Sequence, residues 1–145
     1  MLQAAAISPL AALAACSTNE GVTVTSSDDV VRQAVADSEQ GLLGRYDATI
    51  AAYPALAEKL RPLRDQHAEH LAAVGSTTRD GDQQAASVAK TSAAAVQALT
   101  AAERTAATER TVACGQATSA DLIWILALIA TSEAQHAAVL SKGSA

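Results

Sequence analysis

Residues 120–140 read ADLIWILALIATSEAQHAAVL. The apolar residues of this stretch recur at alternating spacings of four and three, which is the period of a helix that buries one face in a bundle. The same period continues through Glu133 and His136, where apolar residues are expected. The stretch therefore predicts a long helix whose buried face turns polar. That face consists of Leu122, Leu126, Ile129, Glu133, His136 and Leu140.

A second stretch, LAEKLRPLRDQHAEHLAAV at 56–74, has the same pattern. Its apolar face also turns polar twice, at His67 and His70. The chain contains three His, and because all of them lie on these two faces, none is used elsewhere. The second predicted face consists of Leu56, Leu60, Leu63, His67, His70 and Val74.

Pro and Gly residues divide the remaining chain into helical segments. Ser27, followed by two Asp, is a typical N-cap with an acidic first turn. Pro62 lies inside the second segment and is expected to kink that helix or to mark its true start. The predicted helices span 28–53, 54–74, 83–113, and from a Thr118 or Ser119 cap to about 140.

Four helices with mostly short connections favour an antiparallel four-helix bundle over 28–142. The polar stretch GSTTRDGD at 75–82 is a predicted loop. It either crosses the bundle or joins neighbouring antiparallel helices, and its shortness favours the second arrangement. Composition agrees with an all-α fold, since 37 of the 145 residues are Ala and Phe is absent, and Ala is depleted in strands.

The charged residues argue against nucleic acid as a partner. Ten Lys and Arg stand against fifteen Asp and Glu, which gives a formal net charge of -5, and the basic residues are scattered singly rather than gathered in a patch. Several ionisable residues fall off the buried faces and are expected at the surface: Glu69, Glu109, Arg32, Arg45, Arg61 and Arg64.

The first sixteen residues, MLQAAAISPLAALAAC, form an apolar run that ends in small residues. The run is too short to span a bilayer and is typical of a secretory signal. Leu13-Ala14-Ala15-Cys16 resembles the lipobox of bacterial lipoproteins, although no Lys or Arg precedes the run. The resemblance implies a signal at 1–16, lipid on Cys16, a tether at 17–27, and export to the outer face of the cytoplasmic membrane. The alternative is an Ala-rich helix that stays attached.

Two further features concern possible partners. If Cys16 carries lipid, Cys114 is a lone thiol in an exported protein, and we interpret it as a half-buried residue in a turn; without processing, a disulfide between the two is possible. The segment LIWILALI at 122–129 is apolar around most of its circumference. A helix of this kind is buried on more than one side, so we expect a homodimer through Ile123 and Trp124.

The other two predicted helices also carry an acid on their apolar faces, Glu39 in the first and Glu103 in the third. Burying a carboxylate costs several kcal/mol unless it is paired or bound to metal, and residues at i and i+3 can grip one ion from one face. Tyr46 is close enough to Glu39 along the helix to donate a hydrogen bond to this site, or it packs in the core. The candidate metal ligands are Glu39, His67, His70, Glu103, Glu133 and His136.

These residues also form an internal repeat. The offset from Glu39 to Glu103 is 64 residues, and HAEH at 67–70 matches EAQH at 133–136 with an offset of 66. The pattern indicates a diverged duplication of a two-helix unit. The alternative to a metal site is a buried network of Glu and His joined by hydrogen bonds.

A Glu from each of two helices and Glu-x-x-His from the other two is the arrangement of ferritin-like di-iron and di-manganese proteins. The chain resembles this superfamily over 28–140, and particularly its small actinobacterial exported domains of unknown function. The matching residues are Glu39, His70, Glu103, Glu133 and His136.

The chain departs from the superfamily at His67, where a Glu is expected. One bridging carboxylate is thereby lost, and three Glu with three His suit a single Zn, Cu or Fe ion at least as well as a dinuclear site; Mn stays possible through the resemblance. Three functions follow: a metal-binding lipoprotein that sequesters or senses a transition metal, a di-iron-type oxidase, or a metal-free bundle that acts as an interaction module.

Overall fold

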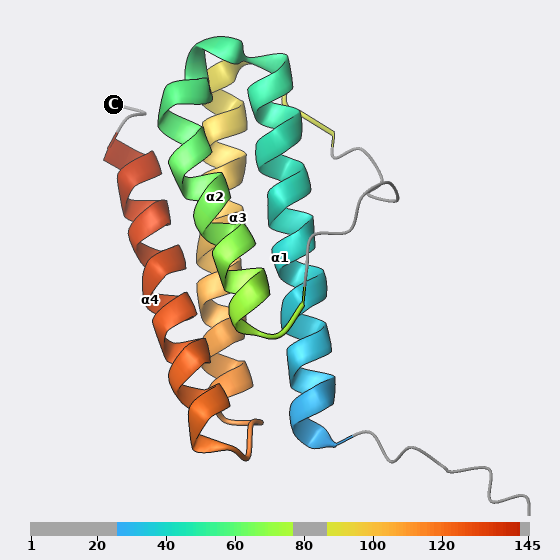
Figure 1. Ribbon diagram of the computed structural model, residues 1–145. Coiled ribbons are helices and arrows are strands. Elements are labelled where there is room, and N and C mark those ends of the chain that lie inside the picture. Colours follow the sequence, from blue (N-terminus) through green and yellow to red (C-terminus); the bar gives the residue numbers. More distant parts are fainter. Residues whose placement is uncertain (1–25, 77–86, 143–145) are drawn as a thin grey trace, which may run out of the picture.

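A computed structural model describes residues 26–76 and 87–142, and within these ranges the chain is helical with no strand (Figure 1). The all-α prediction is therefore confirmed. The signal at 1–16, Cys16 and the first part of the tether, 17–25, lie outside the described residues. The elements are α1 (Ser27–Ala52), the short 3-10 helix η1 (Pro54–Leu56), α2 (Ala57–Ala73), α3 (Ser92–Cys114) and α4 (Ala120–Lys142).

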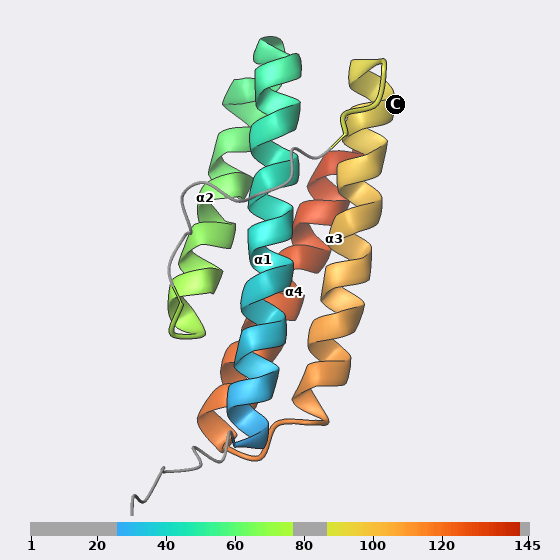
Figure 2. The ribbon, with the colours of Figure 1, turned by 90° about the vertical axis from the view of Figure 1, so that its right-hand side faces the viewer.

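The helices form two antiparallel hairpins, α1 with α2 and α3 with α4, packed side by side (Figures 1 and 2). The end of α2 lies beside the start of α1, where Arg32 Nη1 donates to the Val74 carbonyl at 3.4 Å. The approach to α3 lies at the opposite end of the bundle, where the Tyr53 hydroxyl donates to the Ala89 carbonyl at 2.7 Å. α2 and α3 therefore run in the same direction, and the prediction that their connection joins neighbouring antiparallel helices is wrong.

The start of α3 explains this error. The helix begins at Ser92 instead of the predicted 83, with Thr91 as the N-cap whose hydroxyl accepts from the Ala94 N–H at 3.2 Å. Residues 87–91 are not helical, and 77–86 lie outside the described residues. The connection is consequently longer than the predicted loop at 75–82, long enough to reach the far end of the bundle.

The start of α1 differs from the prediction by one residue. Ser26, not Ser27, is the N-cap: its hydroxyl accepts from the Asp29 N–H, and the Asp29 carboxylate accepts from the Ser26 N–H, both at 3.1 Å. This reciprocal capping box satisfies two N–H groups that a helix start leaves open. Ser26 and Ser27, which were predicted as the end of the tether, therefore belong to the start of α1.

In the second predicted helix, Pro54 opens the 3-10 turn η1 and α2 itself begins at Ala57. α2 continues across Pro62, so this proline does not mark the helix start. In α3, Cys114 is the last helical residue, and it is half-buried with its thiol 3.7 Å from the Ile123 carbonyl. α4 begins directly after Ser119, as predicted.

A carboxylate from α1 holds the start of α4. Asp28 accepts from the N–H groups of Thr118 at 2.7 Å and Ser119 at 3.0 Å, and from the Thr118 hydroxyl at 3.0 Å. The hydrogen bonds from Ser119 and Thr118 lower the pKa of Asp28 to about 2. Because the first N–H groups of a helix have no partner within it, this contact both caps α4 and ties the two hairpins together.

The core consists of two apolar clusters along the bundle, with a polar layer between them. One cluster lies toward the start of α1 and includes Val35, Leu71 and Leu126; the other lies toward the end of α1 and includes Tyr46, Leu60 and Leu99. The faces predicted from the spacing of apolar residues are the buried faces of α1, α3 and α4, and of α2 except that Leu56 and His70 are partly exposed.

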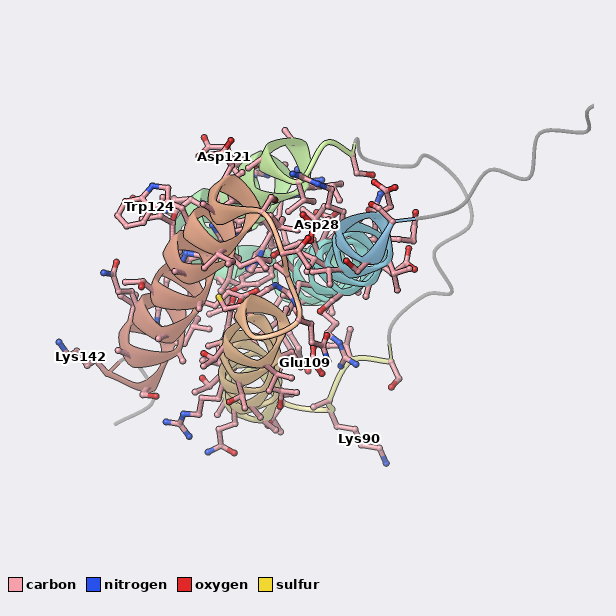
Figure 3. All side chains as sticks on the ribbon, turned by 90° about the horizontal axis from the view of Figure 1, so that it is seen from below. Asp28, Lys90, Glu109, Asp121, Trp124 and Lys142 are labelled. Atoms are coloured by element: carbon pink, nitrogen blue, oxygen red, sulfur yellow. The ribbon has the colours of Figure 1, made fainter. Side chains whose placement is uncertain are left out.

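α4 also exposes an apolar face. Trp124 is 67% exposed and projects away from the bundle (Figure 3), and Ile123 and Leu128 are exposed beside it. α4 is long and apolar enough to cross a membrane, but the core helix of a soluble protein meets the same criterion of length and composition. The homodimer expected through Ile123 and Trp124 stays a prediction.

Candidate metal centre

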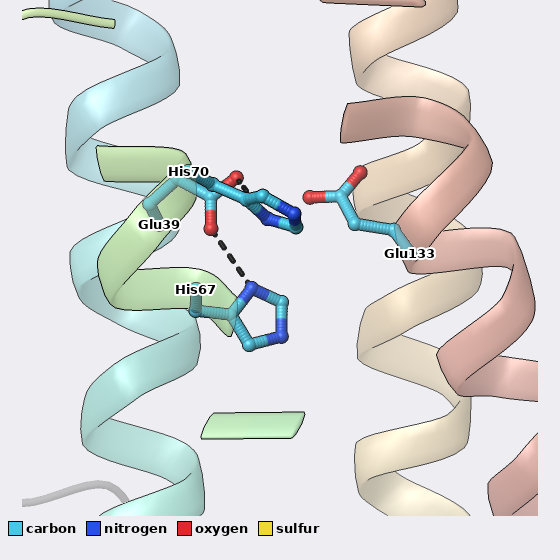
Figure 4. Close-up of side chains that lie close together, drawn as sticks. All are labelled: Glu39, His67, His70 and Glu133. Atoms are coloured by element: carbon cyan, nitrogen blue, oxygen red, sulfur yellow. Dashed lines mark hydrogen bonds and ion pairs between the residues drawn. The ribbon is translucent and has the colours of Figure 1, made fainter. Parts of the chain in front are cut away.

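The polar layer brings together the six residues that the sequence singled out, with at least one from every helix. Five of them are at most 3% exposed, and the side chain of His70 is 13% exposed. Figure 4 shows four of them, with His70 and Glu133 pointing toward one another across the bundle. The six residues are Glu39 on α1, His67 and His70 on α2, Glu103 on α3, and Glu133 and His136 on α4.

His67 lies at the centre of the layer and bridges two carboxylates. Its Nδ1 is 2.8 Å from Glu39 Oε2, and its Nε2 is 2.9 Å from Glu103 Oε1. Burial by itself lowers the pKa of His67, but the hydrogen bonds to Glu103 and Glu39 outweigh burial and raise the pKa to about 9. At neutral pH, without metal, the imidazolium donates one hydrogen bond to each carboxylate.

The two bridged carboxylates are ionised. Burial raises the pKa of each, but their cationic and hydrogen-bonding neighbours outweigh it. For Glu39 these neighbours are His67, His70 and Arg110, and for Glu103 they are mainly His136 and His67; both pKa values fall to about 2. The Tyr46 hydroxyl also donates to Glu103 Oε1, and burial, the charge of Glu103 and this hydrogen bond raise the pKa of the tyrosine. Both roles considered for Tyr46 are therefore present, because it donates this hydrogen bond and also packs in an apolar cluster.

Arg110 is a residue of the centre that the sequence did not predict. It is 2% exposed, and its Nη2 lies 3.2 Å from Glu39 Oε1 and 3.3 Å from Glu133 Oε1. A guanidinium stays protonated in proteins, so a permanent positive charge sits between these two acids. The signal was available, because Arg110 follows Glu103 by seven residues and therefore lies on the same helix face.

Glu133 differs from the other two acids. Burial raises its pKa to about 8, and the nearby charge of Arg110 offsets only part of this effect. Neither of its carboxyl oxygens has a hydrogen-bond partner among the described residues. Without metal, Glu133 is mostly protonated at neutral pH.

His136 is held from its outer side. Its Nε2 lies 3.0 Å from Gln66 Oε1, while its Nδ1 faces Glu103 Oε1 at 3.3 Å without the geometry of a hydrogen bond. Gln66 was not predicted as part of the centre; it is three residues after Leu63 and one before His67, at the edge of the predicted face. The Nδ1 of His136 is thus a buried ligand atom directed at a carboxylate.

The internal repeat extends to the new residue. Tyr46 and Arg110 are 64 residues apart, the same offset as Glu39 and Glu103. Each donates to the glutamate of the other hairpin, Tyr46 to Glu103 and Arg110 to Glu39. We therefore divide the centre into a Glu103 half (Tyr46, Glu103, His136) and a Glu39 half (Arg110, Glu39, His70), with His67 between the two carboxylates.

Two overlapping sets of ligand atoms are close enough for one ion each, with all atoms of a set within 4.8 Å of one another. Buried polar atoms without a hydrogen-bond partner occur in both: Nδ1 of His70 and both Glu133 oxygens in one, and Glu103 Oε2 and His136 Nδ1 in the other. Such orphaned atoms fit a bound cation. The sets are Glu39, His67, His70 and Glu133, and His67, Glu103 and His136.

The residues expected at the surface lie there. Glu69, Glu109, Arg45 and Arg61 are exposed, and Arg32 and Arg64 are partly exposed. Arg64 pairs with Asp47 at 2.9 Å across the α1–α2 hairpin. None of these six residues belongs to the centre.

Comparison of this chain with protein-family models, with curated proteins and with solved structures found no match. The chemistry of the centre therefore carries the functional argument.

Proposed function

We propose that this protein binds one divalent transition-metal ion in the polar layer, through His67, Glu103 and His136. In this proposal the bundle is a ferritin-like domain, exported and anchored by lipid, that sequesters or senses the metal. The directions of the four helices support the ferritin-like assignment, since a bundle whose two hairpins are joined by one crossover connection is of the ferritin-like kind.

The observation that carries the proposal is the support behind both histidines. Metal-ligating His residues usually direct their second ring nitrogen to a carboxylate or carbonyl oxygen, which fixes the tautomer. His67 directs Nδ1 to Glu39, and His136 directs Nε2 to the Gln66 side-chain oxygen. Their remaining nitrogens, Nε2 of His67 and Nδ1 of His136, both face Glu103.

Two imidazoles and one carboxylate suit Zn²⁺ or Fe²⁺. Binding requires His67 to release the proton on Nε2, because only the unprotonated nitrogen is a ligand. The proton on Nδ1 stays in the hydrogen bond to Glu39. When bound, such an ion supplies a Lewis acid in a site shielded from water by the two apolar clusters.

A metal-free bundle is the second candidate, and the charges of the centre favour it. The ionised Glu39 and Glu103 are balanced by Arg110 and protonated His67, while Glu133 is mostly neutral. The charges of these groups thus balance one another without an ion. A di-iron-type oxidase has less support, because it needs a bridging carboxylate where the chain has His67, and because the Arg110 guanidinium already lies between Glu39 and Glu133.

Metal analysis of the full-length chain, purified in mild detergent, separates these candidates. After loading with Zn²⁺ or Fe²⁺ and removal of excess metal, we expect about one ion per chain. His136→Ala removes a ligand of the proposed site and should weaken binding by more than about 100-fold, since even residues behind a ligand cost 10- to 100-fold.

His70→Ala is the matched control, because His70 occupies the position equivalent to His136 in the other hairpin. It should keep the ion. Negligible metal in the wild-type chain would favour the metal-free bundle, and equal loss in both variants would argue against the ligand set proposed here.

The proposed anchor has a separate test. In bacteria that process lipoproteins, the wild-type chain should fractionate with membranes, and Cys16→Ser should move it to the soluble fraction. Cys114→Ser is the control and should stay with the membranes. Membrane association of Cys16→Ser, or a soluble wild-type chain, would contradict the lipid anchor.

A further inference from the structure

The two halves of the centre are related by the internal repeat but differ in charge at one pair of positions. α1 carries neutral Tyr46, and α3 carries Arg110 at the equivalent position. Both side chains cross the bundle to the opposite glutamate. The Glu103 half therefore receives a neutral donor, whereas the Glu39 half receives a fixed cation.

Arg110 lies where a metal ion bound by the two acids would lie, and it is not a surface salt bridge. Its Nη2 lies between Glu39 Oε1 and Glu133 Oε1, at 3.2 and 3.3 Å, and the side chain is 2% exposed. These two acids, with His67 and His70, form the larger of the two ligand sets. A second cation there would meet the guanidinium charge at short range, where low local dielectric strengthens repulsion.

We propose that the Arg110 guanidinium takes the place of a metal ion in the Glu39 half of the centre, and that a neutral side chain at this position opens a second cation site formed by Glu39, His70 and Glu133. This inference rests on the proposed function for its chemistry. It adds that the arginine sets the number of ions the bundle accepts.

The experiment uses the full-length chain and Co²⁺ as the probe, with bound metal measured by elemental analysis and by the visible absorption of the ion. The wild-type chain should bind about one Co²⁺ and Arg110→Met about two, because a two-ion carboxylate centre becomes available. Arg110→Lys keeps a positive charge and should stay at about one. Bound Co²⁺ should also raise the Tm of Arg110→Met more than that of the wild-type chain.

Helical circular dichroism checks that each variant is folded. If Arg110→Met does not fold, Arg110→Tyr is the second variant, since it places in α3 the residue that α1 has at the equivalent position. One ion in the wild-type chain and one in a folded neutral variant overturns the inference while leaving the proposed function intact. Two ions in the wild-type chain overturn it as well.

Loss of the proposed function is a separate outcome. If the wild-type chain binds no Co²⁺, the proposed function fails. A gain of one ion in the neutral variant would then still support the inference about Arg110, whereas no gain would overturn that inference as well.

Discussion

The α1–α2 and α3–α4 hairpins occupy equivalent places around the polar layer, yet they solve the problem of a buried acid differently. In the first hairpin the partner helix carries His67, which becomes a cation between Glu39 and Glu103. In the second, the equivalent position is Glu133, which is held mostly neutral, and the cation is Arg110 on the same helix as Glu103. Two hairpins with the same residue pattern can therefore keep a similar geometry while their charges differ.

The difference also separates a titratable cation from a permanent one. His67 can release a proton and become a ligand, whereas Arg110 cannot deprotonate in a protein. The centre can therefore exchange a positive charge for a metal ion at His67 but not at Arg110.

The largest effect on stability is expected from Arg110→Met in the metal-free protein. The substitution removes one of the cationic neighbours of the ionised Glu39 and the ion-pair partner of Glu133, and breaking a buried ion pair by removing one partner costs about 3 kcal/mol or more. Urea denaturation should show this loss in the free energy of unfolding. A loss below about 0.5 kcal/mol would mean that Arg110 does not compensate the two acids.

The pH dependence of the metal-free protein tests the titratable cation. His67, with its pKa raised to about 9, contributes stability that is complete below its ordinary value of 6.5 and is lost as the pH rises toward 9. Glu133, with its pKa raised from 4.5 to about 8, opposes folding increasingly as the pH rises through this range. Both effects act between 6.5 and 8, where together they should lower the free energy of unfolding by about 3 kcal/mol.

The acid side has the opposite sign. Glu39 and Glu103, with pKa values lowered to about 2, contribute stability above 4.5 that is lost as the pH falls toward 2. Maximum stability is therefore expected near pH 5, measured as Tm across a buffer series. Bound metal should flatten the loss above pH 6.5, because the ion replaces the proton on His67. A Tm that rises from pH 6.5 to 8 in the metal-free protein would contradict these assignments.

Tyr46→Phe removes the neutral counterpart of Arg110 and should have a smaller effect. The hydroxyl donates to an ionised carboxylate, and hydrogen bonds to charged groups contribute about 1.5 to 3 kcal/mol, while Glu103 keeps its bond from His67. We expect a loss of about 1.5 kcal/mol in urea denaturation. A loss as large as that of Arg110→Met would mean that the two halves do not differ in their dependence on charge.

The sequence predicted the centre better than it predicted the connections around it. Glu39, His67 and Glu133 could be found because an ionisable residue interrupts an otherwise apolar helix period, and burial follows from that period. Arg110 obeys the same period, but a long basic side chain on a helix is ordinarily assumed to reach water, and it was overlooked for this reason. What the period cannot give is which buried groups pair across helices.

The prediction of how α2 and α3 run relative to one another depended on where α3 begins, and the local sequence indicates that start only weakly. Residues near 83 are compatible with a helix, and the true cap, Thr91, is one of many Thr and Ser residues that could serve. Its position matters because it lengthens the connection enough to reverse the inferred arrangement. A short loop was a reasonable expectation only as long as the helix started early.

The smallest effect is expected from Asp28→Asn, which acts far from the polar layer, at the end of the bundle where α1 meets α4. An amide oxygen can still accept from Thr118 and Ser119, but it lacks the negative charge that favours a helix start. The expected result is a slightly lower Tm, with the stability profile between pH 6.5 and 8 unchanged, since Asp28 has its pKa near 2 and does not titrate there. The variant thus separates two ways in which the hairpins are joined. If Asp28→Asn changed the stability profile above pH 6.5, the pKa values of His67 and Glu133 would depend on the contact between α1 and α4 at Asp28. The charges of the polar layer would then not be determined by the residues of the layer alone.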